Sequence, residues 1–446
     1  MTRVLAFLLA AAAVVLCSAM PARASDPTPR TPIRHFITLM QENHTFDNYF
    51  GTYPGVDGIP KDTCVPLGRK PKPCFRPFHV GENAIAQRDL DHSQMTYRLQ
   101  YNGGRMDGFI RALGLRNQDG RLALGYRDDR DIPYYWNLAD QYVLYDRFFS
   151  SAGAGSFLNH IYWAAASPGD GYDRVPPNGF GNLKTIFDRL EAKGISWKFY
   201  VQNYEPKLNR RTINRFPGNR ASQVIWVPLL NFDRYLDNPK IMRHIVNLDQ
   251  YFVDLQTGHL PAVSYIAPSG PSEHPPSSLT SGQAFVRSLI NALMRSRDWK
   301  DSAFLLSYDD WGGFYDHVKP PQVDAYGYGF RVPSLLVSPY ARRGFVDSTT
   351  LDFTSILRFI EDNWSLRPLT QRDAKAKSIA GGFDFSRPPR EAEFVSARRG
   401  VAEQARPKRN LIYLFYLGAV ALPAGIMVWA AAASRRRRAS EAGERA

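Results

Sequence analysis

Two acidic segments of the sequence carry side chains suited to binding a cation. Glu42 and Asn43 directly follow one apolar run, and Asp309 and Asp310 directly follow another. Adjacent carboxylates at the end of a buried strand repel each other unless a cation or hydrogen-bond donors offset their charge. Carboxylate and amide oxygens are ligands that hard divalent ions accept. We therefore predict a metal site at Glu42, Asn43, Asp309 and Asp310. Helix capping by Asn43 or Asp47, or a solvated acidic loop, is the alternative interpretation.

One serine is a candidate nucleophile. Ser156 follows a further apolar run and the small-residue turn Ala152–Gly155. This pattern predicts a bend at the start of a helix, where free N–H groups favour an anion. A hydroxyl at that position can attack phosphorus if a bound cation lowers its pKa. A serine with no role beyond the turn is the alternative interpretation.

Three histidines complete the candidate set: His92, His274 and His317. Each lies in a polar segment beside a carboxylate residue or a proline. A lone histidine is usually structural, but histidines in such surroundings also suit phosphate contacts, metal ligation or protonation of a leaving group.

These residues need a scaffold, and the apolar pattern predicts an α/β one. Short apolar runs predict buried strands at Ile33–Met40, Tyr142–Phe149, Ser196–Val201, Ala262–Ile266, Ala303–Tyr308 and Val332–Val337. Helical periodicity lies between them, at Leu183–Ala192, Ala284–Met294 and Phe353–Trp364. Alternating strands and helices favour a mainly parallel sheet covered on both faces, which binds ligands beyond the carboxyl ends of its strands. Two long insertions, roughly 55–135 and 204–250, are expected to form a cap or rim.

Both ends of the chain carry targeting signals. Arg3, an apolar run and Ala22-Arg23-Ala24 predict a secretory signal peptide cleaved after Ala24, with an uncleaved anchor helix as the alternative. The uncharged stretch Leu411–Ala433 has the length of a membrane-spanning helix, and Arg435–Arg438 follow it. The positive-inside rule then predicts a single-pass membrane protein whose main domain is exported and whose C-terminus is cytoplasmic.

Cysteine content and charge add two weaker indications. Without Cys17 of the signal segment, only Cys64 and Cys74 remain, and in an oxidising compartment we expect them to form a local disulfide. The formal net charge of +14 would draw the protein toward anionic lipid or phosphorylated substrates. The sequence contains no basic motif interleaved with aromatic residues, so we expect no nucleic-acid partner.

The order of the motifs resembles that of a known family. The segment Glu42–Gly51 reads ENHTFDNYFG, Tyr308–Pro321 reads YDDWGGFYDHVKPP, and Glu273–Pro275 reads EHP. From about Ile33 to Trp364 the chain is similar to the bacterial phosphoesterase family that contains phospholipases C, plant non-specific phospholipases C and acid phosphatase A. That family looks like a relative of alkaline phosphatases and sulfatases.

The resemblance implies a fold and a set of roles. The fold would be a three-layer α/β/α sandwich around a mostly parallel sheet. The matching positions imply metal or active-centre roles for Glu42, Asn43, Asp309 and Asp310, the nucleophile at Ser156, a phosphate contact at Asn159, and phosphate-side histidines at His92, His274 and His317. The chain departs from the family pattern in three places. Ala152–Gly155 replaces a turn that usually contains proline, His160 stands where arginine is common, and Asp310 stands where many phospholipases have glutamate.

The sequence therefore predicts a metal-assisted phosphoric ester hydrolase. Ser156 would attack phosphorus with the help of a divalent ion (Ca, Mg, Mn or Zn), and a histidine would protonate the leaving group. Phospholipid headgroups, cleaved as by a phospholipase C, are the expected substrate. The alternatives are an acid phosphatase acting on soluble phosphomonoesters and a non-catalytic receptor for phosphorylated ligands. The expected organisation is a signal peptide at 1–24, the catalytic domain at 25–390, a charged juxtamembrane linker at 391–410, a transmembrane helix at 411–433 and a basic tail at 434–446.

Overall fold

The computed structural model describes residues 26–81, 88–216, 222–270, 272–399, 419, 423, 425, 427 and 429–433. The chain divides into two compact units, residues 1–397 and 398–446. The predicted signal peptide, at 1–24, lies outside the described residues, and its cleavage remains a prediction.

An eight-stranded sheet forms the centre of the first unit. Its strands in chain order are β1 (His35–Gln41), β6 (Val143–Tyr145), β7 (Trp197–Val201), β8 (Ile245–Asn247), β9 (Val263–Ala267), β10 (Ser302–Tyr308), β11 (Ser334–Val337) and β12 (Phe345–Asp347). Their order across the sheet is β12-β6-β11-β10-β1-β9-β7-β8. Strand β11 is antiparallel to both of its neighbours, and the other neighbouring pairs are parallel. The sheet is therefore mixed and mostly parallel.

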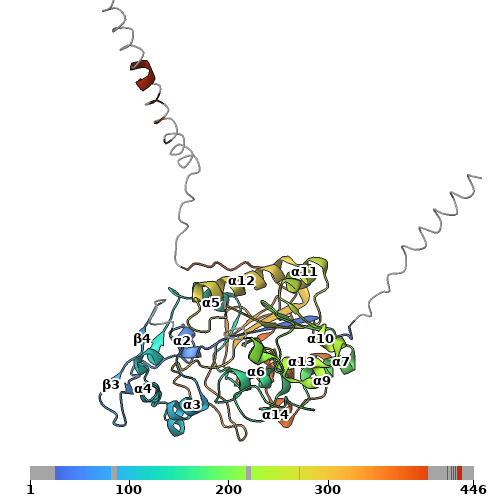
Figure 1. Cartoon of the computed structure of the whole chain (residues 1–446), viewed down its shortest axis with the longest axis horizontal. Helices are drawn as coiled ribbons and strands as arrows, with labels where there is room; N and C mark the ends of the chain where they lie inside the picture. Colours follow the sequence, from blue (N-terminus) through green and yellow to red (C-terminus); the bar gives the residue numbers. More distant parts are fainter. Residues whose placement is uncertain are drawn as a thin grey trace, which may run out of the picture. The chain divides into compact units, whose positions relative to one another are not determined.

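Helices cover both faces of this sheet (Figure 1). In that view α5 (Pro133–Gln141), α11 (Asp249–Thr257) and α12 (Leu279–Arg295) lie along one face. On the other face lie α6 (Ser156–Ala165), α7 (Ile186–Lys193), α9 (Asp233–Leu236), α13 (Phe353–Trp364) and α14 (Gln371–Lys375). The other α-helices within the described part of residues 26–399 are α2 (Phe46–Phe50), α3 (Gln94–Tyr101), α4 (Phe109–Gly114), α8 (Ser222–Trp226) and α10 (Pro239–Met242). The arrangement has the three layers expected for an α/β/α sandwich.

The strong sequence patterns predict these elements well. All six predicted strands are confirmed, with β6 shorter than its apolar run. Helix α13 has the predicted bounds, and α12 extends beyond its predicted range at both ends. Helix α7 ends just before Gly194, and this glycine has the left-handed backbone conformation. Strand β8 was not predicted, because it lies in the 204–250 segment that was interpreted as a cap or rim. Its three residues nevertheless add an edge strand to the main sheet.

The 55–135 segment packs beside the carboxyl end of β10. It contains the short strands β2 (Val65–Pro66), β3 (Cys74–Phe75), β4 (Phe78–His79) and β5 (Gly125–Tyr126) together with α3 and α4. The predicted disulfide between Cys64 and Cys74 is confirmed. A small apolar core joins this segment to Trp311 and Phe330, so it buries the residues that follow the second acidic pair.

The fold prediction needs one correction at its C-terminal end. Within the part of the chain that the structure describes, no helix is both long enough and apolar enough to cross a bilayer. This finding contradicts the predicted transmembrane helix at 411–433, and with it the predicted single-pass localisation with a cytoplasmic C-terminus. Most residues of that stretch lie outside the described ones, where an apolar sequence alone carried the prediction.

Candidate active site

The register of the two central strands brings the two acidic segments together. Strands β1 and β10 are parallel neighbours in which Gln41 pairs with Tyr308, so both chains leave the sheet at the same edge. The backbone N–H of Asn43 then donates to Asp309 Oδ1 at 2.9 Å. The four predicted metal-site residues are all fully buried: Glu42, Asn43, Asp309 and Asp310.

Two glycines after the acidic pair make this close packing possible. Gly312 and Gly313 both have positive φ angles, 56° and 81°. A Cβ on Gly312 would lie 2.7 Å from the Asn43 Cβ, and one on Gly313 would lie 2.6 Å from the Leu90 Cβ. Any other residue would therefore displace either the first acidic segment or the loop that carries His92.

Ser156 lies where the sequence predicted it, as the first residue of α6. Its Oγ is 3.3 Å from Glu42 Oε2 and 3.4 Å from Asp310 Oδ2, with the hydroxyl as donor. Asn159 lies one turn further but turns away from this cluster. Its side-chain N–H groups donate to the carbonyls of Ala154 and Gly155 at 2.9 and 3.1 Å, so it holds the turn before the serine.

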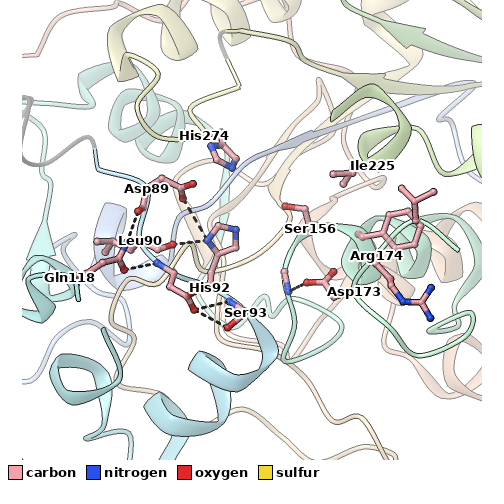
Figure 2. A pocket seen from close by; sticks show the side chains of 14 residues that line it. Asp89, Leu90, His92, Ser93, Gln118, Ser156, Asp173, Arg174, Ile225 and His274 are labelled. Carbon is pink, nitrogen blue, oxygen red and sulfur yellow. Dashed lines mark hydrogen bonds and ion pairs between the residues drawn. The ribbon is translucent and has the colours of Figure 1, made fainter. Parts of the chain in front are cut away.

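A cavity of about 490 Å³ opens above Ser156 and contains two of the predicted histidines (Figure 2). The His92 Nδ1 donates to the Leu90 carbonyl at 2.7 Å, and the His274 Nδ1 donates to the Pro275 carbonyl at 2.8 Å. Burial lowers the pKa of His92, but the carboxylates of Asp310 and Asp89 outweigh it and raise this pKa to about 9. These carboxylates therefore favour the protonated form of His92, which can donate a hydrogen bond into the cavity.

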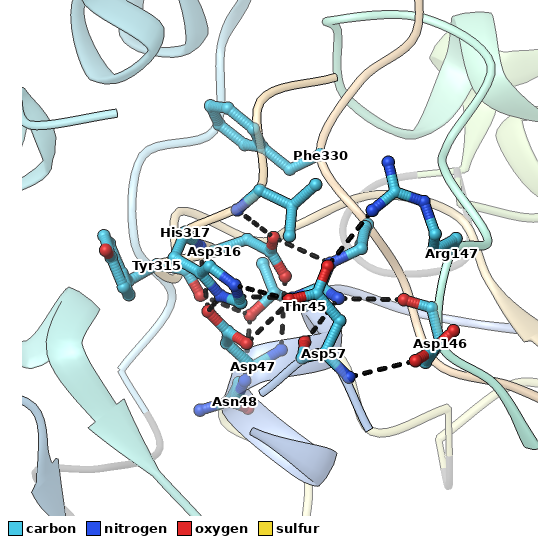
Figure 3. Close-up of polar contacts among 12 residues, drawn as sticks. Thr45, Asp47, Asn48, Asp57, Asp146, Arg147, Tyr315, Asp316, His317 and Phe330 are labelled. Atoms are coloured by element: carbon cyan, nitrogen blue, oxygen red, sulfur yellow. Dashed lines mark hydrogen bonds and ion pairs between the residues drawn. The ribbon is translucent and has the colours of Figure 1, made fainter. Parts of the chain in front are cut away.

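His317 is not brought into this cavity (Figure 3). Its Nδ1 is 2.7 Å from Asp47 Oδ2 and its Nε2 is 3.2 Å from Asp57 Oδ1. The buried Arg331 joins the same network, pairing with Asp47 and Asp316 at 2.9 Å each. Both ring nitrogens of His317 are thus engaged in an ion-pair network that links the first motif to the last one.

The acidic cluster is short of hydrogen-bond donors. Burial raises the pKa of Glu42 well above its usual range, and the charges of Asp309 and Asp310 raise it further. Burial and then the charge of Asp309 do the same for Asp310. Glu42 Oε1, Asp309 Oδ2 and both side-chain polar atoms of Asn43 have no hydrogen-bond partner among the described residues. A divalent cation fits these ligand atoms, because it would coordinate the oxygens that lack hydrogen bonds and offset the negative charge of the carboxylates.

Two residues of the site were not predicted. Asp173 accepts hydrogen bonds from the N–H groups of Gly155 and Leu158 at 2.7 and 3.1 Å, and so caps α6 next to Ser156. A Cβ on Gly155 would lie 2.6 Å from Asp173 Oδ2, which explains why glycine precedes the serine. His160 lies one turn after Ser156, with Nε2 3.5 Å from Glu42 Oε1. Its i,i+4 spacing from the serine was a signal for this residue, whereas no local pattern marks Asp173.

The EHP segment has a structural role in addition to carrying His274. The Glu273 carboxylate is fully buried and accepts hydrogen bonds from the hydroxyls of Tyr49, Tyr135 and Tyr308. Burial raises the pKa of Glu273 to about 7, although the three hydroxyls oppose the shift. This carboxylate anchors the loop that places His274 over the cavity.

Comparisons with known proteins agree with the motif pattern. The family model described as the Phosphoesterase family matches residues 33–367. A non-hemolytic phospholipase C of Burkholderia pseudomallei is 29% identical over 83% of this chain and 61% of the relative. Phospholipase C A of Mycobacterium tuberculosis is 29% identical over 81% of this chain and 79% of the relative. The chain thus spans less than two thirds of the first relative's length.

A plant protein and a solved structure extend the set. Non-specific phospholipase C1 of Arabidopsis thaliana is 26% identical over 81% of this chain and 72% of the relative. A solved protein of the alkaline phosphatase superfamily from Vibrio parahaemolyticus has a TM-score of 0.37 and 10% identity, and the match covers 83% of this chain and 76% of that one. The family model spans most of the chain, including both acidic segments, Ser156 and the EHP element. The chain belongs to the phosphoesterase family, and the predicted class of phosphoric ester hydrolase is confirmed at the level of that family.

Proposed function

We propose that the protein is a metal-assisted phosphoester hydrolase of the phospholipase C type, with Ser156 as its nucleophile. One observation carries the proposal. Ser156 is the first residue of α6, and its hydroxyl lies within 3.4 Å of two buried carboxylates. Carboxylate and amide oxygens beside it lack hydrogen-bond partners within the described part of the chain. Family membership supports the reaction class, and the relatives' names support a phospholipid as substrate.

Glu42, Asn43, Asp309 and Asp310 would hold the metal ion. When bound, such an ion supplies Lewis-acid stabilisation of the phosphoryl oxygens and lowers the pKa of a nearby hydroxyl. The donor set of carboxylates and one amide oxygen accommodates calcium, magnesium, manganese or zinc.

The side chains around this site supply the nucleophile, the proton acceptor and the proton donor of the reaction. Ser156 Oγ forms a bond to phosphorus while its proton passes to Glu42 or Asp310, the two carboxylates it already contacts. The bond to the leaving oxygen breaks, and that oxygen takes a proton from a histidine of the cavity. His92 and His274 line the cavity, whereas His317 does not, so the first two are the proposed proton donors. Water then hydrolyses the ester between Ser156 and phosphorus, which releases the phosphorylated headgroup from a phospholipid or inorganic phosphate from a monoester.

The cavity itself favours a substrate with a positively charged headgroup. Two carboxylates line it: Asp89, whose Oδ1 is 3.6 Å from His92 Nδ1, and Asp173, which caps α6 on the Ser156 side. A cationic headgroup would be attracted there, whereas an additional anionic group would be repelled. Phosphatidylcholine is therefore the first substrate to test, and a small phosphomonoester is the alternative.

A single variant tests the proposal. The Ser156→Ala variant should bind divalent metal as the wild type does and release no diacylglycerol from phosphatidylcholine vesicles and no nitrophenol from p-nitrophenyl phosphate. Comparing wild-type turnover of the two substrates separates the phospholipase from the acid-phosphatase alternative. Wild-type turnover in the Ser156→Ala variant would refute the nucleophile assignment. A wild-type protein that binds phosphocholine but turns over neither substrate would instead favour the receptor alternative.

A further inference from the structure

We propose that His160 is a nitrogen ligand of the metal ion held at the acidic cluster, so that the site selects a transition ion such as Zn²⁺, Mn²⁺ or Co²⁺ over Ca²⁺ and Mg²⁺. The inference rests on the metal site of the proposed function and adds to it a ligand and a class of metal. None of the sequence patterns assigned such a role to this histidine.

The orientation of the His160 ring points to the tautomer that binds metals. The side chain is buried in α6, with 1% of its surface exposed. Its Nδ1 is 2.9 Å from the carbonyl oxygen of Ser156, one turn earlier in the helix. A carbonyl oxygen only accepts, so Nδ1 carries the proton and the lone pair of a neutral ring is on Nε2. A backbone carbonyl on one ring nitrogen is the usual way in which proteins orient a ligating histidine.

The lone pair of Nε2 points toward other acceptors. Nε2 lies 3.5 Å from Glu42 Oε1, and neither atom has a hydrogen-bond partner within the described ranges. Glu42, His160 and Asp309 each offer one atom within 4.8 Å of the others. Three buried acceptors that face one another at these distances repel, unless a cation or a proton lies between them.

The spacing fits a small transition ion. Ligands at about 2.1 Å from one ion, in tetrahedral or octahedral arrangement, lie roughly 3.0–3.5 Å apart. The 3.5 Å between Nε2 and Glu42 Oε1 is at the upper end of that range. Calcium is larger, binds about 6–8 oxygen ligands at about 2.3–2.6 Å and makes little use of imidazole. Imidazole together with carboxylate is typical of zinc, manganese, iron and cobalt.

A buried structural histidine is the competing interpretation. His160 packs edge-on against Trp163, with ring centroids 6.0 Å apart, and a protonated ring would donate from Nε2 to Glu42. His244 provides a matched control for such a role. Its Nδ1 also bonds a carbonyl oxygen, that of Trp197, at 2.9 Å, and its ring stacks on the Trp197 indole. It lies between α10 and β8, and its Nε2 is 3.6 Å from Glu191 Oε1 rather than near the acidic cluster.

The decisive measurement reads the metal rather than turnover. The full chain, freed of metal with a chelator and loaded with Mn²⁺, should show hyperfine coupling to a histidine nitrogen in pulsed electron paramagnetic resonance. The coupling should be lost in the His160→Gln variant and kept in His244→Gln. The His160→Gln variant should also bind Co²⁺ and Zn²⁺ at least about tenfold more weakly, since even second-shell partners of a metal-bound histidine contribute about that much, while its Mg²⁺ affinity stays unchanged.

Three outcomes would overturn the inference: no nitrogen coupling in the wild type, coupling that persists in His160→Gln, or Ca²⁺ binding tighter than Zn²⁺ in the wild type. Absent nitrogen coupling or tighter Ca²⁺ binding in the wild type overturns the inference even if the variant fails to fold. They also separate the inference from the proposed function. A metal site without nitrogen, combined with an inactive Ser156→Ala variant, refutes only the His160 ligand. Nitrogen coupling with full Ser156→Ala activity refutes only the nucleophile.

Discussion

The buried carboxylate of Glu273 makes the stability of the protein depend on pH in a predictable direction. Its pKa rises from the usual 4.5 to about 7 in the folded state, mainly because of burial among Tyr49, Tyr135 and Tyr308. A carboxyl group with a raised folded-state pKa stabilises the fold when it is protonated. That contribution is fully present below about pH 4.5 and is lost as the pH rises through about 7. The pKa difference corresponds to about 3 kcal/mol.

The Glu273→Gln variant isolates this effect because glutamine mimics the protonated carboxyl. Urea unfolding followed by tryptophan fluorescence should give nearly equal stability for variant and wild type at about pH 4.5. Above that pH the unfolding free energy of the variant should increasingly exceed that of the wild type, by up to about 3 kcal/mol at about pH 8.5, because only the wild type must ionise a buried group. Other titrating groups cancel in the difference. A stability difference that stays constant with pH, or that favours the wild type at high pH, would refute the reasoning.

Three further predictions follow from the site and its supports. The Asp173→Ala variant should lower kcat on p-nitrophenyl phosphate about tenfold, because a lost helix cap of about 1–2 kcal/mol loosens the start of α6. Asp173→Asn should be intermediate, and an unchanged kcat in both would contradict this. The Arg331→Met variant should lose about 3–5 kcal/mol of unfolding free energy, because Asp47 and Asp316 remain buried without their partner. The exposed Arg343→Met control should change it by less than about 1 kcal/mol. Chelation should abolish turnover and added divalent metal should restore it, so activity that survives exhaustive dialysis against chelator would exclude an essential ion.

The central sheet was predictable because burial on both faces makes its strands continuous apolar runs. Strands β1 and β10 have no exposed residue to interrupt the pattern, so their ends, and the acidic residues after them, could be located from sequence. The edge strands β8 and β12 are three residues long and partly exposed, so neither periodicity nor length marked them. The stretch at 411–433 shows the opposite error, an element predicted in excess. Its apolar sequence alone predicted a spanning helix, and no such helix occurs among the described residues.

The histidines show why adjacency in sequence is a weak guide to adjacency in a site. His317 stands eight positions after Asp309, yet the chain reverses at Gly312–Gly313 and brings its ring to Asp47 instead. His92 and His274 come from segments far from the acidic pairs in sequence, and the fold places both in the Ser156 cavity. No local signal separates these two outcomes, since each histidine stands beside a carboxylate or a proline.

The two long motifs act as one structural unit, and this explains why each contains both chemical and structural carboxylates. In the first motif Asn43 packs against Gly312 and its backbone N–H bonds Asp309, while Asp47, in the first turn of α2, pairs with Arg331 and His317. The turn between Asp309 and His317 must therefore satisfy two fixed neighbours at once. If Arg331 were lost, Asp47 would keep only His317 as a charged partner, and α2, which begins four residues after Glu42, would be held less firmly. The ion-pair network thus supports the proposed metal site from its far side, so we expect its loss to weaken metal affinity as well as stability.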